Sequence, residues 1–178
     1  MPAARASVAR LPQAGRPAAR GDRGHAAGSV GGTLTYRLHL LHKLSDQESH
    51  RRYPQEAGLS LSDGRCLAAI GSFEPLSVMD LALRANLTKG QASRAAQSLV
   101  DQGFVHKTDS PSDGRGVSLS LTPRGRKVWH KTMALIERRN EEIFGCLGAQ
   151  EQRQLGALLD RLIAHVQRKA TDDEGQGA

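Results

Sequence analysis

Hydrophobic residues recur at helical spacing near both ends of the patterned part of the chain. The first stripe predicts a helix over about 33–53, because Tyr53 precedes Pro54 and is disfavoured in the α conformation. A second stripe predicts a last helix over about 149–168. The apolar positions of the two stripes are Leu34, Leu38, Leu40, Leu41, Leu44, Leu155, Leu158, Leu159, Leu162, Ile163 and Val166. A small lobe between them cannot cover both stripes, so we expect them to pack against a second copy in a homodimer.

Shorter helical segments are expected between these two helices. Ser62, Ser77 and Thr88 each stand where a serine or threonine caps a helix, and Gly103 supplies a left-handed stop. The helix after Thr88 has one apolar face of small residues, formed by Ala92, Ala95, Ala96 and Leu99. Small inward residues allow this helix to pack closely on its neighbours, which predicts that its polar face projects outward.

After Gly103 the period of the pattern changes from that of a helix to that of a strand. This part of the sequence predicts a β-hairpin with the tip SPSDGRG. Its first strand contains Val105 and Lys107, and its second strand is the alternating segment 117–121. Thr122 and Pro123 then predict the cap and first turn of a long helix over about 123–146. The order of elements predicts a mainly α fold with a small β-hairpin wing. The winged helix-turn-helix would span about 60–122, and the terminal helices would form the dimerisation domain.

The polar face of the helix after Thr88 carries two cations and no acid, which favours DNA over an ordinary solvated face. Such a helix enters the major groove and reads base edges. At the hairpin tip, Asp113 can hold the Arg115 guanidinium extended toward an adjacent minor groove. The residues expected to contact DNA are Thr88, Lys89, Gln91, Ser93, Arg94, Gln97, Ser98, Lys107, Asp113 and Arg115.

Charge supports a polyanionic partner and composition excludes several classes of protein. The 178 residues include 25 Lys plus Arg against 18 Asp plus Glu, a net charge of +7. Residues 1–30 hold five arginines and one aspartate without any helical or alternating pattern, which predicts a disordered basic tail, and residues 171–178 predict an acidic tail. The longest apolar runs have four residues, which excludes a transmembrane helix. Two cysteines exclude a disulfide scaffold and fit a cytoplasmic protein.

These motifs resemble the MarR family (multiple antibiotic resistance type regulators) over about residues 33–168. The resemblance is carried by the segment LTKGQASRAAQSLVDQGFV, by Asp113-Gly114-Arg115 and by the following LTPRG. It implies a homodimeric regulator of transcription that binds a pseudo-palindromic double-stranded DNA operator. Gly114 departs from the second basic residue that family members often have there, which removes one phosphate contact.

The resemblance also implies a small anionic effector, often phenolic, in a crevice between the dimer helices and the DNA-binding lobe. Arg65 is placed to neutralise its carboxylate, whereas Cys66, Trp129 and Met133 have core packing as their alternative role. The residues expected to line the crevice are Tyr36, His39, Arg65, Cys66, Trp129 and Met133. We expect a repressor that a small aromatic or phenolic acid releases from its operator, with no cofactor and no bound metal.

Other functions stay open at this point. The arginine-rich tail suits a non-specific or architectural nucleic-acid-binding protein. Cys66 would make the chain a thiol redox-sensing regulator if its thiol were acidic and accessible. An enzyme is disfavoured, because the seven histidines are scattered and the sequence has no nucleophile-elbow, phosphate-loop or zinc-protease spacing.

Overall fold

The computed structural model describes residues 29–109 and 117–175, and internal contacts divide the chain into two units, residues 1–40 and 41–178. The described part of the first unit contains the 3-10 turn η1 (Val30–Gly32) and the beginning of helix α1 (Leu34–Arg52). α1 ends one residue before Tyr53, as the proline predicts, and a π-helical turn, η2 (Tyr53–Ala57), follows it. The leucines of the predicted stripe on α1 are all exposed in the single chain.

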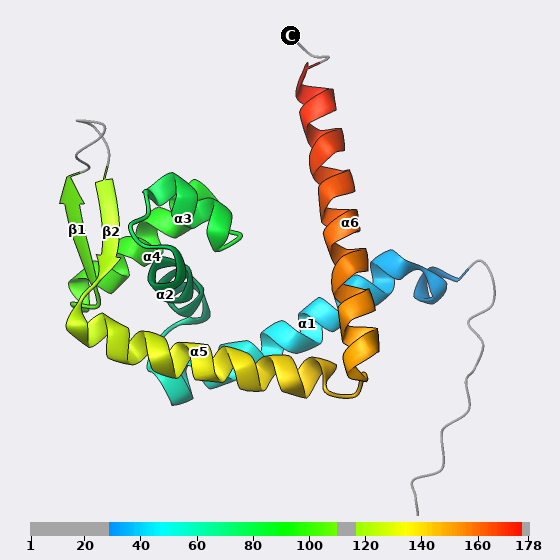
Figure 1. Cartoon of the computed structure of the whole chain (residues 1–178), viewed down its shortest axis with the longest axis horizontal. Coiled ribbons are helices and arrows are strands. Elements are labelled where there is room, and N and C mark those ends of the chain that lie inside the picture. Colours follow the sequence, from blue (N-terminus) through cyan, green and yellow to red (C-terminus); the bar gives the residue numbers. More distant parts are fainter. Residues whose placement is uncertain (1–28, 110–116, 176–178) are drawn as a thin grey trace, which may run out of the picture. The chain divides into compact units, whose positions relative to one another are not determined.

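The helices and the hairpin of the second unit follow the predicted order (Figure 1). Helix α2 begins earlier than expected, because Ser60 and not Ser62 is its cap: the Ser60 hydroxyl accepts a 3.1 Å hydrogen bond from the Asp63 amide. α2 also continues past Gly71, which lies against Trp129 and does not break the helix. The elements are α2 (Leu61–Phe73), α3 (Val78–Arg84), α4 (Lys89–Asp101), β1 (Val105–Asp109) and β2 (Val117–Leu121).

One hydrophobic core joins α2, α3, α4 and the hairpin. Five of its leucine and isoleucine side chains have no exposed surface, and the small inward face of α4 is at most 4% exposed. The fully buried leucines and isoleucine of this core are Leu67, Ile70, Leu81, Leu99 and Leu119. Burial of an aliphatic side chain of this size contributes about 1.5–3 kcal/mol, so these residues hold α4 firmly in the lobe.

The loop before α3 is attached to the wing, a contact that the sequence pattern did not predict. Leu76 and Leu119 exchange two backbone hydrogen bonds, of 3.1 and 2.8 Å, beside the antiparallel pairing of β1 with β2. The Glu74 carboxylate accepts a 2.6 Å hydrogen bond from the Leu121 amide and also pairs with Arg126. The wing is therefore fixed at its base from three directions: α2, the loop before α3 and the long helix that follows.

That long helix, α5 (Pro123–Phe144), begins as predicted with Thr122 as cap and proline in its first turn. The last helix, α6 (Ala149–Gly175), runs beyond the expected end at residue 168 and includes part of the expected acidic tail. No proline interrupts it, and the first glycine after Gly156 is Gly175. None of the helices in residues 29–109 and 117–175 has the length and hydropathy of a membrane-spanning segment.

Candidate functional site

The start of α4 is fixed by a reciprocal cap. The Thr88 hydroxyl accepts a hydrogen bond from the Gln91 amide at 3.3 Å, and the Gln91 side-chain oxygen accepts one from the Thr88 amide at 2.9 Å. This capping box satisfies backbone N–H groups that the first turn of a helix leaves free. The first turn of the predicted recognition helix is thereby held in place.

Most of the polar residues expected on α4 lie on its exposed face. Gln97 donates a 2.8 Å hydrogen bond to the carboxylate of Asp101, which brings an acid to the last turn of this face. Lys89 and Arg94 have no carboxylate partner among the described residues. The exposed members of the predicted set are Thr88, Lys89, Gln91, Ser93, Arg94 and Gln97. An exposed cationic face with free hydrogen-bonding groups suits phosphates and base edges.

Ser98 lies differently from the expectation. It is half-buried, and its hydroxyl donates a 3.0 Å hydrogen bond to Asp63 on α2 while accepting one from Gln102, also at 3.0 Å. Its position at the edge of the polar face brings it against α2 and away from the exposed side. Ser98 therefore ties α4 to the lobe.

On the hairpin, His106 and Lys107 are exposed on β1, opposite Ser120 and Leu119 of β2. Asp113 and Arg115, the residues expected at the tip, lie outside the described residues. At the start of α5, the Arg124 guanidinium lies 5.0 Å from the centre of the Phe104 ring. Cations thus occur on α4, on β1 and at the beginning of α5.

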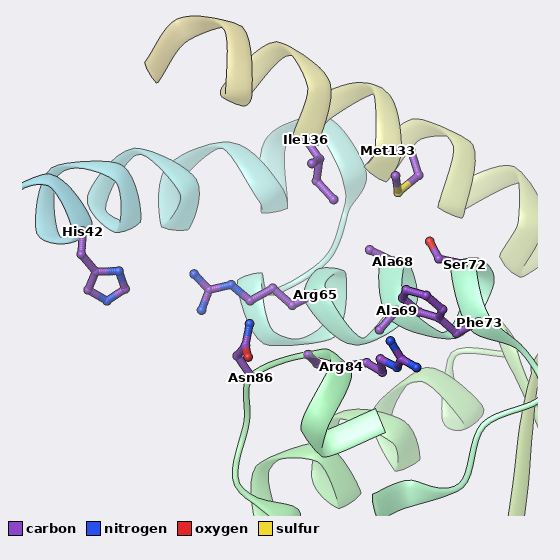
Figure 2. A pocket seen from close by; sticks show the side chains of 11 residues that line it. His42, Arg65, Ala68, Ala69, Ser72, Phe73, Arg84, Asn86, Met133 and Ile136 are labelled. Atoms are coloured by element: carbon purple, nitrogen blue, oxygen red, sulfur yellow. The ribbon is translucent and has the colours of Figure 1, made fainter. Parts of the chain in front are cut away.

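A cavity of about 540 Å³ lies in the second unit, between α1, α2, α5 and the end of α3 (Figure 2). Ala68 and Ala69 contribute small apolar surfaces from α2, and Met133 and Ile136 contribute larger ones from α5. The polar groups come from five other lining residues, which are His42, Arg65, Ser72, Arg84 and Asn86. The wall therefore combines apolar and polar groups, and a volume of this order is typical of small-molecule sites.

At one end of the cavity, a carboxylate on α1 contacts two of the lining residues, Arg65 and His42. Asp46 on α1 accepts a 2.8 Å hydrogen bond from Arg65 and lies 3.4 Å from the Nε2 atom of His42. At the other end, the Arg84 guanidinium lies 4.4 Å from the centre of the Phe73 ring. Asn86 follows α3 in a left-handed conformation, with φ of 54°, which asparagine tolerates better than most residues.

Two of the six residues expected to bind the effector, Arg65 and Met133, line this cavity. Trp129 is half-buried, and its Nε1 atom donates a 3.3 Å hydrogen bond to the Ala68 carbonyl, so it packs on α2. Tyr36 and His39 lie in the first unit, where both are exposed. Arg84 and Asn86 were not among the predicted residues, because Arg84 is the last residue of α3 and Asn86 lies in the turn that follows, where the helical pattern ends.

Comparison with known proteins decides the family. A family model described as the MarR family matches residues 57–116. The transcriptional repressor Mb2911 of Mycobacterium bovis is 30% identical over 105 residues, which cover 59% of this chain and 76% of that protein. The chain belongs to the MarR family. The regulator BilQ of Clostridium symbiosum, 29% identical over 108 residues that cover 61% of this chain and 75% of BilQ, is a further relative.

Solved structures agree with the MarR fold. A MarR-family regulator of Silicibacter pomeroyi has a TM-score of 0.68 at 22% identity, covering 78% of this chain and 92% of that one. Rv2887 of Mycobacterium tuberculosis, solved in complex with salicylic acid, has a TM-score of 0.58 at 27% identity, covering 73% and 96%. MarR-family proteins are DNA-binding transcriptional regulators, so this chain is a regulator of transcription and not an enzyme.

The MarR fold places Cys66 where a thiol sensor is disfavoured. The side chain has no exposed surface, and burial, followed by the nearby Asp63 carboxylate, raises the pKa of its thiol to about 12. A thiol of this kind holds almost no reactive thiolate near neutral pH. Cys66 also does not line the cavity, so it packs in the core of this MarR-family lobe.

Proposed function

We propose that this MarR-family protein binds a pseudo-palindromic operator as a homodimer and represses transcription until a small aromatic acid enters its cavity. The observation that carries the operator contact is the capped helix α4, with a buried alanine face and an exposed polar face. A helix fixed in this way can enter the major groove with its outer side chains toward the bases. Lys107 on the hairpin, and Asp113 and Arg115 beyond it, complete the proposed contact with the neighbouring groove.

The apolar stripes of the terminal helices support the homodimer. On α6, Leu158, Leu162, Ile163 and Val166 are 52–64% exposed in the single chain. On α1, Leu34, Leu38 and Leu44 are 55–77% exposed. Continuous apolar stripes of this kind mark a protein interface, and a second copy brings an identical stripe that suits a two-fold contact.

The occupant of the cavity is proposed from the relatives and from the wall of the cavity. Rv2887, 26–27% identical to this chain, has been solved in complex with salicylic acid and with p-aminosalicylic acid. The cavity here offers apolar contacts for a ring from Met133 and Ile136 and a guanidinium from Arg65 for an acid group. Guanidinium and carboxylate pair through two parallel hydrogen bonds, which makes the acid a suitable partner.

The test measures binding to the DNA upstream of the gene that encodes this chain. Light scattering should give twice the mass of the chain, and a labelled fragment that contains an inverted repeat should be displaced by the same unlabelled repeat and not by a scrambled one. Salicylate should release the fragment. Equal competition by scrambled DNA would favour the non-specific nucleic-acid-binding alternative, and a monomer that binds with full affinity would refute the homodimer.

A matched pair of variants adds a residue-level test. Arg94→Ala should weaken operator binding by about 1–3 kcal/mol, because it removes an exposed cation from the proposed recognition face. Arg153→Ala removes an exposed arginine of α6 that forms no ion pair with any described residue, and it should leave operator affinity unchanged. Equal affinities of the two variants would argue against α4 as the recognition helix.

A further inference from the structure

We propose that the effector is an aromatic acid with two separated anionic groups, such as a benzene dicarboxylate, held by Arg65 at one end and by Arg84 at the other. This inference rests on the proposed function, since it concerns the chemical class of ligand that the cavity of the regulator selects. A ligand with a single carboxylate would satisfy only one of the two guanidinium groups.

The two arginines lie on different elements and point away from each other. Arg65 is on α2 and Arg84 is the last residue of α3, and both line the same cavity. In Figure 2 the Arg65 side chain extends toward His42, whereas the Arg84 side chain extends toward the Phe73 ring. A single carboxylate cannot lie against both guanidinium groups when they face opposite ends of the cavity.

The two arginines differ in how far their positive charge is neutralised by neighbouring carboxylates. At the Arg65 end, Asp46 already neutralises part of the positive charge through its 2.8 Å hydrogen bond. At the other end, no carboxylate within the described part of the chain pairs with Arg84. The Arg84 guanidinium instead lies 4.4 Å from the Phe73 ring centre, a cation–π contact that holds its plane while its N–H groups stay free to bind.

The middle of the cavity fits the ring of such a ligand. Ala68 and Ala69 provide a floor without long side chains, and Met133 and Ile136 lie opposite them on α5 (Figure 2). The volume of about 540 Å³ leaves room for substituents on both sides of a single ring. The centre, to which Ser72 adds one hydroxyl group, and the two cationic ends therefore match an aromatic ring with acid groups at positions that point apart.

A bridging ligand would also act on the recognition helix. Arg84 ends α3, Asn86 lines the cavity from the following turn, and Thr88 caps α4. A dianion that joins Arg65 to Arg84 would fix this turn against α2, whereas a monoanion at Arg65 would not reach it. The dicarboxylate should therefore release DNA at lower concentration than the monocarboxylate.

The test compares matched acids by titration calorimetry on the full chain. Benzene-1,3- and 1,4-dicarboxylate should bind about 10-fold more tightly than benzoate, because the second carboxylate gains a charge-assisted pairing. Arg84→Gln should remove this preference, so that dicarboxylate and benzoate then bind with affinities within about twofold of each other. Lys131→Gln removes an exposed cation of α5 outside the cavity and serves as the charge-matched control.

The outcomes separate this inference from the function on which it rests. Three outcomes would refute the proposal of a dianionic effector. The two acids could bind with equal affinity, Arg84→Gln could weaken the binding of both acids equally, or neither acid could bind. If salicylate still releases the operator in the first two cases, the proposed function stands without it. If the dicarboxylate binds through Arg84 but never changes operator affinity, the ligand class holds and the release mechanism is refuted.

Discussion

The Ser98 hydroxyl on α4 donates a 3.0 Å hydrogen bond to the Asp63 carboxylate on α2. The same hydroxyl oxygen accepts a hydrogen bond from Gln102, so the hydroxyl acts as both donor and acceptor within the lobe. Asp63 in turn belongs to the capped first turn of α2. The contact therefore joins the second half of α4 to the beginning of α2, the helix that lines the cavity.

Replacement of Ser98 by alanine should lower the free energy of unfolding by about 1 kcal/mol, since it removes a half-buried hydrogen bond to a carboxylate. The base preference of the protein should not change. Ser93→Ala is the matched control: Ser93 is exposed on the same helix, and this variant should keep its stability. Urea unfolding and binding to a library of operator variants measure the two effects. A change of base preference in Ser98→Ala would restore Ser98 to the DNA contact.

Gln91 has two roles that two substitutions separate. Its side-chain oxygen closes the capping box with Thr88, so Gln91→Ala should lower stability by about 1 kcal/mol and also alter base preference. Gln91→Glu keeps an oxygen acceptor for the cap but places a negative charge on the face proposed to meet DNA. This variant should remain stable in thermal unfolding and lose operator affinity in gel shifts. Full operator affinity in Gln91→Glu would exclude Gln91 from the interface.

The elements of the lobe could be predicted because each one is fixed by local chemistry. Thr88 caps α4 as expected, the alanine face of α4 is buried, and Pro123 begins α5. Register within a helix is less certain from periodicity alone. Ser98 stands at the border between the buried and exposed faces, where a rotation of a few degrees decides which side a side chain meets.

Only part of the cavity could be predicted, because some of its lining residues meet through tertiary packing and not through a local pattern. Arg65 and Met133 could be found because they lie on the expected helices. Arg84, Asn86 and Phe73 come from segments where helices end, and their meeting depends on how α3 packs on α2. The hydrogen bonds between Leu76 and Leu119 also depend on tertiary packing, since they join positions 43 residues apart that no local pattern relates.

The two cysteines should differ in reactivity. Cys146 is exposed and should react with iodoacetamide in the native protein, whereas buried Cys66 should react only after unfolding. Mass spectrometry of native and urea-treated samples distinguishes one label from two. Cys146→Ser provides the control, which should take up no label before unfolding. Rapid labelling of Cys66 in the native protein would instead support the thiol redox-sensing alternative.

The same burial predicts an alkaline limit of stability. The folded pKa of Cys66 is raised to about 12 from an ordinary value of 9.0, so the unfolded chain ionises first as pH rises. This contribution to stability is complete below pH 9 and is lost progressively toward pH 12. Cys66→Ala should have a flatter dependence of unfolding free energy on pH across this window, although its stability at pH 7 is lower. An unchanged slope would show that Cys66 does not carry the dependence.

Gly125 is required by the close approach of α5 to the chain just before the hairpin. A Cβ atom at this position would lie 1.8 Å from the Phe104 carbonyl oxygen, which is backbone and cannot turn away. Gly125→Ala should therefore destabilise the protein by about 3 kcal/mol or more and displace the base of the wing. Gly156→Ala, within α6, meets nothing within 4 Å and should instead stabilise the helix by about 0.5–1 kcal/mol. Chemical unfolding of the two variants measures these opposite shifts. A Gly125→Ala protein of unchanged stability and operator affinity would mean that α5 can move away from Phe104 without cost.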